Sequence, residues 1–204
     1  MVFNLPNSLT ALRIVLAPLF FMLFISADPV MKQISLLVYM VAALTDWYDG
    51  EIARSSGTVS NFGKFLDPLA DKILTAFALV GLTVINVVPL WMVIVIIARD
   101  VVVTSLRVYA ESRQFHVKTT RLAQWKTFVQ MAVLYYLLVL TIAAVTPWLP
   151  AGLTPVIQTL LDPTAVYSLM TIVTAITVYT GVQYIWDCRH MFGDISKLQR
   201  RATG

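Results

Sequence analysis

Charged residues are scarce in this chain: Asp, Glu, Lys and Arg make up 13% of its 204 residues. A soluble domain carries about 25%, so the polar side chains here are too few to cover a surface that faces water. Hydrophobic residues make up 58% of the chain, and its mean hydropathy is +0.78. The composition therefore excludes an ordinary soluble domain and favours an integral membrane protein.

Cysteine and histidine are also rare, and their scarcity excludes two kinds of site. The single cysteine, Cys188, cannot build a disulfide framework within the chain. The two histidines, His116 and His190, lie too far apart in sequence for a zinc site made of His and Cys. The net charge of +4 is attributed to membrane topology, so we expect contact with anionic lipid headgroups and none with nucleic acid.

Long apolar runs predict an all-α, polytopic membrane protein with six transmembrane helices, although the spans 31–54 and 89–112 carry charges in their cytosol-facing halves. Each run is close to the ~20 residues that a bilayer requires, and strands with open edges are excluded in lipid. A loop containing Pro150, Gly152 and Pro155 is predicted between the last two spans. We expect one domain over residues 1–204. The predicted spans are 8–27, 31–54, 66–86, 89–112, 124–146 and 164–188.

Basic residues indicate how these spans are oriented. With six spans, 14 of the 15 Lys and Arg residues fall on one side, and Lys32 is the exception. Basic residues stay on the cytosolic side of a membrane. We therefore expect both termini, the 55–65 loop and the 113–123 loop to be cytosolic, in a multi-pass protein of the plasma membrane.

Two aspartates lie near the cytosolic end of the second predicted span. Asp46 and Asp49 are followed by Gly50 and Ala53, so the four positions are spaced i, i+3, i+4 and i+7. This spacing places them on one face of a helix. The small residues beside the acids leave room for a ligand or for a close approach of another helix.

A second pair of aspartates begins the third predicted span. Asp67 and Asp71 are spaced i, i+4, and Pro68 is expected in the first helical turn, where a missing N–H is tolerated. Counting 1.5 Å per residue from the far side places both pairs about 22 Å into a ~30 Å core. The four carboxylates are therefore expected at one level, just inside the cytosolic border.

Such a cluster needs compensation by positive charge. One interpretation is a rim of salt bridges with Arg54, Lys64 and Lys72. The interpretation we favour is a pair of divalent cations, because hard cations prefer carboxylate oxygens and bind phosphates at the same time. Two such ions side by side form the clamp that is used in phosphoryl transfer.

The aspartates belong to a longer pattern, D-x2-D-G-x2-A-R-x8-G-x3-D-x3-D, which resembles the signature of the CDP-alcohol phosphotransferases. The resemblance implies a six-helix membrane enzyme, usually a homodimer, with two divalent metal ions (Mg²⁺ or Mn²⁺) held by the four aspartates. It also implies a CDP-linked lipid as donor and Asp71 as the general base. The eight matching positions are Asp46, Asp49, Gly50, Ala53, Arg54, Gly63, Asp67 and Asp71.

The same resemblance implies further contacts with the donor. Gly50 allows the nucleotide close to the helix, Arg54 pairs with a phosphate or the cytidine ring, and Ser60 lies where the family contacts the nucleotide. Asn7 and Thr10 are candidates for contact with the lipid phosphate. Capping of the first helix by Asn7, with Thr10 and Arg13 as interfacial anchors, is the alternative.

Four stretches of sequence outside the aspartate pattern indicate the acceptor. Residues 4–13, 98–107, 126–130 and 184–192 resemble the bacterial phosphatidylglycerophosphate synthases, although Ala123-Gln124 replaces a usual Gly-Lys. This likeness implies CDP-diacylglycerol as donor and glycerol 3-phosphate as acceptor, with inositol phosphate or phosphatidylglycerol as alternatives. A phosphate-bearing acceptor needs a cage of cations. The candidate acceptor-binding residues are Arg99, Arg107, Arg121 and Lys126.

Arg99 is a candidate because of its depth: it is expected about 15 Å into the membrane, near the middle of the bilayer. An arginine there is costly unless it faces a polar cavity. The alternative for Arg99 is an ion pair with a carboxylate such as Asp100.

Two other classes of function were considered. A cation or proton transporter needs acids near the bilayer midplane, joined to both faces. The acids on the far side, Asp28 and Asp162, lie in predicted loops. A non-catalytic lipid-binding scaffold would have no use for a general base at Asp71. The aspartate pattern therefore favours an enzyme.

Overall fold

The computed structural model describes residues 5–56, 61–112 and 121–202, with side chains for 11–45, 72–110, 124–150 and 152–189. Within these ranges the fold is all-helical, as predicted. A single 3₁₀ turn, Ala151–Leu153, precedes the sixth helix. The helices are α1 (Leu5–Phe24), α2 (Pro29–Ser56), α3 (Asn61–Val84), α4 (Leu90–Ser112), α5 (Arg121–Ala144), α6 (Thr154–Leu160) and α7 (Pro163–Ala202).

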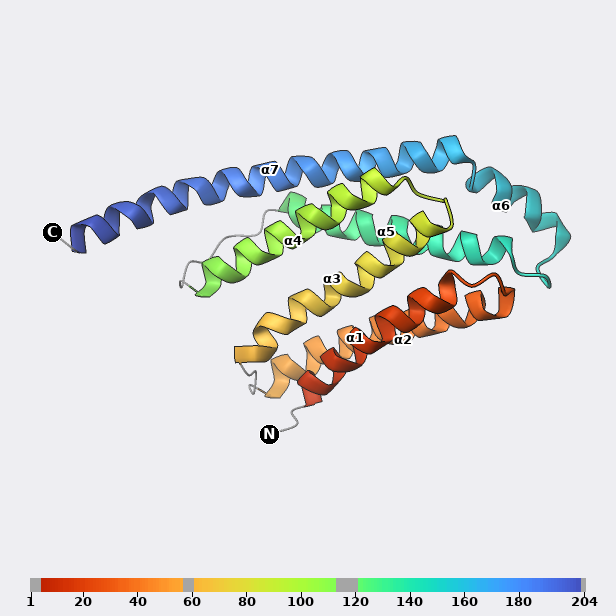
Figure 1. The fold of residues 1–204 in the computed structure, drawn as a ribbon, viewed down its shortest axis with the longest axis horizontal. Helices are drawn as coiled ribbons and strands as arrows, with labels where there is room; N and C mark the ends of the chain where they lie inside the picture. The colour runs from red at the N-terminus through yellow and green to blue at the C-terminus, as the bar shows by residue number, and fades with distance from the viewer. Residues whose placement is uncertain (1–4, 57–60, 113–120, 203–204) are drawn as a thin grey trace.

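The six long helices run alternately up and down. The beginnings of α1, α3 and α5 and the ends of α2, α4 and α7 gather at one end of the molecule, on the left in Figure 1. The short helix α6 lies at the opposite end (Figure 1). This alternation brings the two helix segments that carry the aspartate pairs to the same end of the molecule.

The helices pack around one main core. Helix α1 packs against α2 and α3, α4 packs against α3 and α7, and α5 contacts α2, α3 and α7. Phe20, Tyr39 and Leu137 are among the fully buried side chains. Gly81 allows α1 and α3 to approach closely, because a Cβ atom there would lie 2.8 Å from Cδ1 of Phe24.

Short polar side chains define three helix ends. Asp28 accepts a hydrogen bond from the Val30 backbone N–H at 2.8 Å, at the start of α2. Asp162 accepts hydrogen bonds from the N–H groups of the first turn of α7. Asn86 has φ of +60° and lies just after α3, in the left-handed conformation that Asn tolerates better than most residues. These three residues lie at the end opposite the aspartate pairs.

The apolar helices indicate a membrane protein. Within the described residues, two segments are long and apolar enough to cross a bilayer, Gln124–Ala144 and Pro163–Arg189. Three shorter apolar segments add to them, Ala11–Phe24, Pro29–Thr45 and Lys72–Val84. Large apolar side chains on the outer surface are exposed, such as Met22 at 69% and Phe128 at 66%. A surface of this kind suits contact with lipid.

Four local expectations differ from the structure. The predicted loop after the fifth span contains α6, whose first turn accommodates Pro155. Helix α3 begins at Asn61, so Pro68 lies inside the helix and not in its first turn. Helix α7 continues past the predicted end at 188 to Ala202. Arg13, expected at the interface with Thr10, is only 1% exposed.

Candidate active site

The aspartate pattern lies on continuous helical backbone. Helix α2 runs through Asp46 and Asp49, and α3 runs through Asp67 and Asp71, so both spacings fall on the helices that the prediction requires. Only residues 57–60 separate the two helices in sequence. The side chains of these four aspartates lie outside the described residues, and their convergence stays a prediction.

The other candidates for donor binding also lie outside the described side chains. Ser60 belongs to the range 57–60 that the structure does not describe. Arg121, an acceptor candidate, is the first residue of α5, but its side chain is not described. The remaining candidates occupy helical positions in α1, α2 and α3, namely Asn7, Thr10, Gly50, Ala53, Arg54 and Gly63.

Asp100 is the centre of a buried polar cluster between α4 and α5. Its Oδ1 accepts hydrogen bonds from Nη1 of Arg99 at 3.1 Å and from Nζ of Lys126 at 2.5 Å. Its Oδ2 accepts a hydrogen bond from Nε2 of Gln130 at 3.2 Å. The ion pair between Arg99 and Asp100, one of the two interpretations of Arg99, is therefore present. The structure adds Lys126, a second acceptor candidate, to the same pair.

Arg99 also joins α4 to α7. Its Nη2 donates to Oγ1 of Thr180 at 3.1 Å, and the Thr180 hydroxyl in turn donates to the backbone carbonyl of Ile176. The aliphatic part of Arg99 lies against Gly181, where an added Cβ atom would be 2.8 Å from Cγ of the arginine. The guanidinium is thus held by two helices at once.

Positive charge exceeds negative charge in this cluster. Lys126 is 2% exposed, Asp100 6% and the Arg99 side chain 13%. Among the described side chains, the one carboxylate balances one of the two cations, which leaves a formal charge of +1. Uncompensated buried charge is unfavourable in the low dielectric of a protein interior or a membrane. An anionic ligand beside these residues would supply the missing negative charge.

Arg107 lies two turns of α4 beyond Arg99. It is partly buried. Several buried polar atoms nearby have no hydrogen-bond partner among the described residues. Because such atoms are unfavourable without a partner, they mark a region suited to a polar ligand or to water. These atoms are Nε of Arg99, Nε of Arg107, Oε1 of Gln130 and Oε1 of Gln183.

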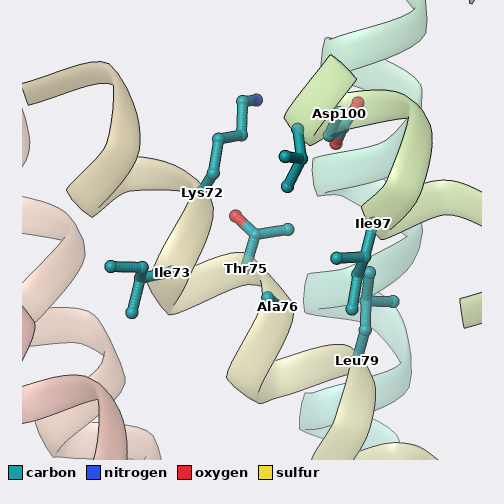
Figure 2. Close-up of a pocket in the computed structure, with 8 residues that line it drawn as sticks. Lys72, Ile73, Thr75, Ala76, Leu79, Ile97 and Asp100 are labelled. Carbon is teal, nitrogen blue, oxygen red and sulfur yellow. The ribbon is translucent and has the colours of Figure 1, made fainter. Parts of the chain in front are cut away.

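A cavity of about 90 Å³ lies between α3 and α4 beside the cluster. Figure 2 shows Lys72 and Asp100 at one end of the cavity, and Ile97 and Leu79 at the other. Lys72 directly follows Asp71 in sequence. The polar end of this cavity therefore connects the helix that carries Asp71 with the cluster around Asp100.

Asp100 was predicted only as a partner for Arg99 and Gln130 only as part of the 126–130 stretch, and Thr180 and Gly181 were not predicted. Two signals could have pointed to Gln130 and Gly181. Lys126 and Gln130 are spaced i, i+4, which places both on one face of α5. Gly181 lies inside a long apolar helix, where glycine commonly marks a close helix approach.

Comparison with known proteins gives a consistent family assignment. The family described as CDP-alcohol phosphatidyltransferase matches residues 3–183. A relative from Bacillus subtilis is 40% identical in an alignment of 141 residues that covers 63% of this chain and 73% of the relative. Relatives from Rickettsia typhi and Salmonella typhimurium are 36% and 35% identical, over 76% and 78% of their length. All three relatives are named CDP-diacylglycerol–glycerol-3-phosphate 3-phosphatidyltransferase.

The match covers the helices that carry the complete aspartate pattern and most of the helices around the Asp100 cluster. The chain is therefore a transferase and belongs to the CDP-alcohol phosphatidyltransferase family.

Proposed function

We propose that the protein transfers the phosphatidyl group of CDP-diacylglycerol to glycerol 3-phosphate, which gives phosphatidylglycerophosphate and CMP, a step of phospholipid biosynthesis. The observation that carries this proposal is the match to relatives named for this activity over 73% or more of their length. The aspartate pattern on α2 and α3 supports the donor. The excess positive charge at Arg99 and Lys126 supports an acceptor that bears a phosphate.

The chemistry is a single displacement at phosphorus. The acceptor hydroxyl oxygen forms a bond to the phosphorus that carries the diacylglycerol, and the bond from that phosphorus to the CMP oxygen breaks. The hydroxyl proton passes to the carboxylate of Asp71, the proposed general base. CMP leaves with the oxygen that bridged the two phosphates.

The four aspartates offer ligands that suit two divalent cations. Asp46, Asp49, Asp67 and Asp71 offer only carboxylate oxygens, the ligands that Mg²⁺ and Mn²⁺ prefer. When bound, such ions would neutralise the diphosphate and the charge that develops on the leaving CMP. The helical backbone at all four positions supports this assignment, since it keeps each pair of acids on one side of its helix.

Further residues of α1, α2 and the segment before α3 bind the donor in this proposal. Arg54 pairs with a phosphate or the cytidine ring, and Ser60 contacts the nucleotide. Asn7 and Thr10 approach the lipid phosphate at the start of α1. The small residues Gly50, Ala53 and Gly63 leave space for the nucleotide beside the helices.

Cations from α4 and α5 bind the acceptor. Arg99, Arg107, Arg121 and Lys126 surround the phosphate of glycerol 3-phosphate in this proposal. Arginine suits the task, because its planar fork can donate two hydrogen bonds to one phosphate. The buried Nε atoms of Arg99 and Arg107 support this assignment, because they have no partner among the described residues.

In the membrane, we propose six spans with both termini in the cytosol of a multi-pass plasma-membrane protein. The alternating course of the long helices and the sorting of basic residues support this topology. The site then lies at the cytosolic border, where soluble glycerol 3-phosphate and CMP enter and leave. A homodimer is proposed from the family resemblance.

An acceptor panel tests the function. Purified protein in detergent is given CDP-diacylglycerol and Mg²⁺, and CMP release is measured with glycerol 3-phosphate, inositol phosphate, phosphatidylglycerol or serine. We expect release to depend on glycerol 3-phosphate, and the Asp46→Asn variant to be inactive. CMP release with another acceptor and none with glycerol 3-phosphate would overturn the acceptor assignment. No release with any acceptor, together with cation flux in vesicles, would favour a transporter.

A further inference from the structure

Asp100 occupies a position that the proposed chemistry does not use. Its two carboxylate oxygens together accept three hydrogen bonds, from Arg99, Lys126 and Gln130. Arg99 is its neighbour on α4, whereas Lys126 and Gln130 come from another helix, α5. One carboxylate therefore fixes the directions of two cations from two helices.

The guanidinium of Arg99 is held by hydrogen bonds on two sides. Nη1 is held by Asp100, and Nη2 is held by Oγ1 of Thr180 on α7. The aliphatic stem lies in the space that Gly181 leaves open. The Nε–H remains without a partner among the described residues. The guanidinium is thus oriented before any ligand arrives, and this kind of order lowers the entropic cost of binding.

Neutralisation of the two cations does not by itself explain why Asp100 lies at the centre of the cluster. The cluster keeps a formal charge of +1 with Asp100 present, so the carboxylate does not remove the attraction for an anion. A carboxylate close to an anion site repels the anion. The position of Asp100 at the centre of the cluster is therefore unfavourable for anion binding, unless the carboxylate has another role there. The distances point to orientation as that purpose.

We propose that Asp100 is a positioning residue of the acceptor site, which holds Arg99 and Lys126 in the arrangement that receives the acceptor phosphate. This inference rests on the proposed function. Asp100 acts through the two cations and does not contact the acceptor itself. Gln130 keeps the carboxylate in place by holding its second oxygen.

The kinetics of Asp100→Asn separate this role from two others. If Asp100 positions the cations, the KM for glycerol 3-phosphate rises about 10-fold or more while the KM for CDP-diacylglycerol stays within about twofold. If Asp100 only tunes charge, the acceptor KM falls, since the cluster gains one positive charge. If Asp100 only joins helices, the melting temperature falls and both KM values stay unchanged. Either of the last two results overturns the proposal.

A double-mutant cycle shows whether Asp100 acts through Lys126. We expect Asp100→Asn combined with Lys126→Gln to raise the acceptor KM by less than the product of the two single effects, because part of the action of Asp100 passes through Lys126 and the rest passes through Arg99. Effects that multiply would overturn the proposed path of action. Asp100→Glu, which keeps the charge, should recover part of the acceptor affinity. Asp162→Asn is the matched control, since it makes the same chemical change at the far end of α7.

A second variant covers the case in which Asp100→Asn does not fold. Gln130→Met removes the hydrogen bond to Oδ2 of Asp100, together with the unpartnered Oε1, and keeps a side chain of similar size. The acceptor KM should rise about threefold with an unchanged donor KM, and an unchanged acceptor KM would overturn the proposal. Wild-type protein that is inactive with glycerol 3-phosphate would instead overturn the proposed function, whatever the variants do.

Discussion

Gly181 and Arg99 lie so close together that a Cβ atom at position 181 would be 2.8 Å from Cγ of the arginine. Cγ is in the middle of the side chain, so a rotation of the guanidinium end cannot relieve this contact. The glycine on α7 is therefore part of what determines where Arg99 lies. The contact joins the packing of α4 against α7 to the proposed acceptor site.

The Gly181→Ala variant tests this connection. We expect the acceptor KM to rise about 10-fold, because the methyl group displaces Arg99, while the donor KM stays the same. The matched control is Gly81→Ala, which crowds Phe24 at the same distance of 2.8 Å but in the main core, away from Arg99. Both variants should lose about 1–3 kcal/mol of stability by overpacking, and only Gly181→Ala should change the acceptor KM. Equal acceptor KM values in the two variants would contradict the connection.

Asp71→Asn should abolish turnover and preserve binding of the donor. The amide cannot accept the proton of the acceptor hydroxyl, and general-base catalysis contributes about 10²–10⁴-fold to a rate. Steady-state CMP release measures the first effect, and equilibrium binding of radiolabelled CDP-diacylglycerol measures the second. Turnover above about a tenth of the wild-type rate would contradict the assignment of Asp71 as base.

Arg107→Ala should weaken binding of the acceptor more than binding of the donor. Loss of a hydrogen bond from a charged group costs about 1.5–3 kcal/mol, so the KM for glycerol 3-phosphate should rise about 10-fold or more. The same measurement on Lys32→Ala provides a control, because Lys32 is a basic residue near the opposite end of the molecule. An Arg107→Ala enzyme with wild-type acceptor kinetics would remove Arg107 from the acceptor site.

Removal of divalent cations should stop the reaction reversibly. Chelation with EDTA is expected to abolish CMP release, and Mg²⁺ or Mn²⁺ should restore it, because the four carboxylates would otherwise repel the diphosphate. Isothermal titration of Mn²⁺ into the apoprotein provides a readout that does not depend on activity. Asp46→Asn should weaken this binding, and full activity in the presence of EDTA would exclude the metal site.

The membrane topology can be tested with single cysteines. Cys188 is the single cysteine of the chain, and it is buried. A Cys188→Ala background therefore has no native thiol that could react. In right-side-out vesicles, Asp162→Cys should react with a membrane-impermeant maleimide added outside, and Lys197→Cys should react only after the vesicles are permeabilised. Labelling of both positions from the outside would contradict six spans with cytosolic termini.

The fold was predictable from the sequence because lipid imposes simple rules. Uncharged runs of about the thickness of a bilayer must be helices, and each predicted span corresponds to one long helix of the structure. The ends of the helices were less predictable, since they depend on local chemistry. Helix α3 begins at Asn61 in spite of Pro68, and α6 forms where several turn-forming residues suggested only a loop.

The site was predictable only in part. The aspartate spacing is a local pattern and can be read from the sequence alone. The cluster around Asp100 joins residues 26 to 81 positions apart in sequence, and no local pattern shows that Asp100, Lys126 and Thr180 meet. The pairing of Asp100 with Lys126 depends on the packing of both α4 and α5 against α3 and α7. Tertiary structure was needed to find it.

The central claim is that the acceptor hydroxyl of glycerol 3-phosphate displaces CMP from CDP-diacylglycerol. The most direct measurement is the transfer of ¹⁴C-labelled glycerol 3-phosphate into lipid by the purified protein, with CMP quantified in the same reaction. We expect one labelled phosphatidylglycerophosphate for each CMP released, and neither product from Asp71→Asn. CMP release without label in the lipid fraction would contradict it.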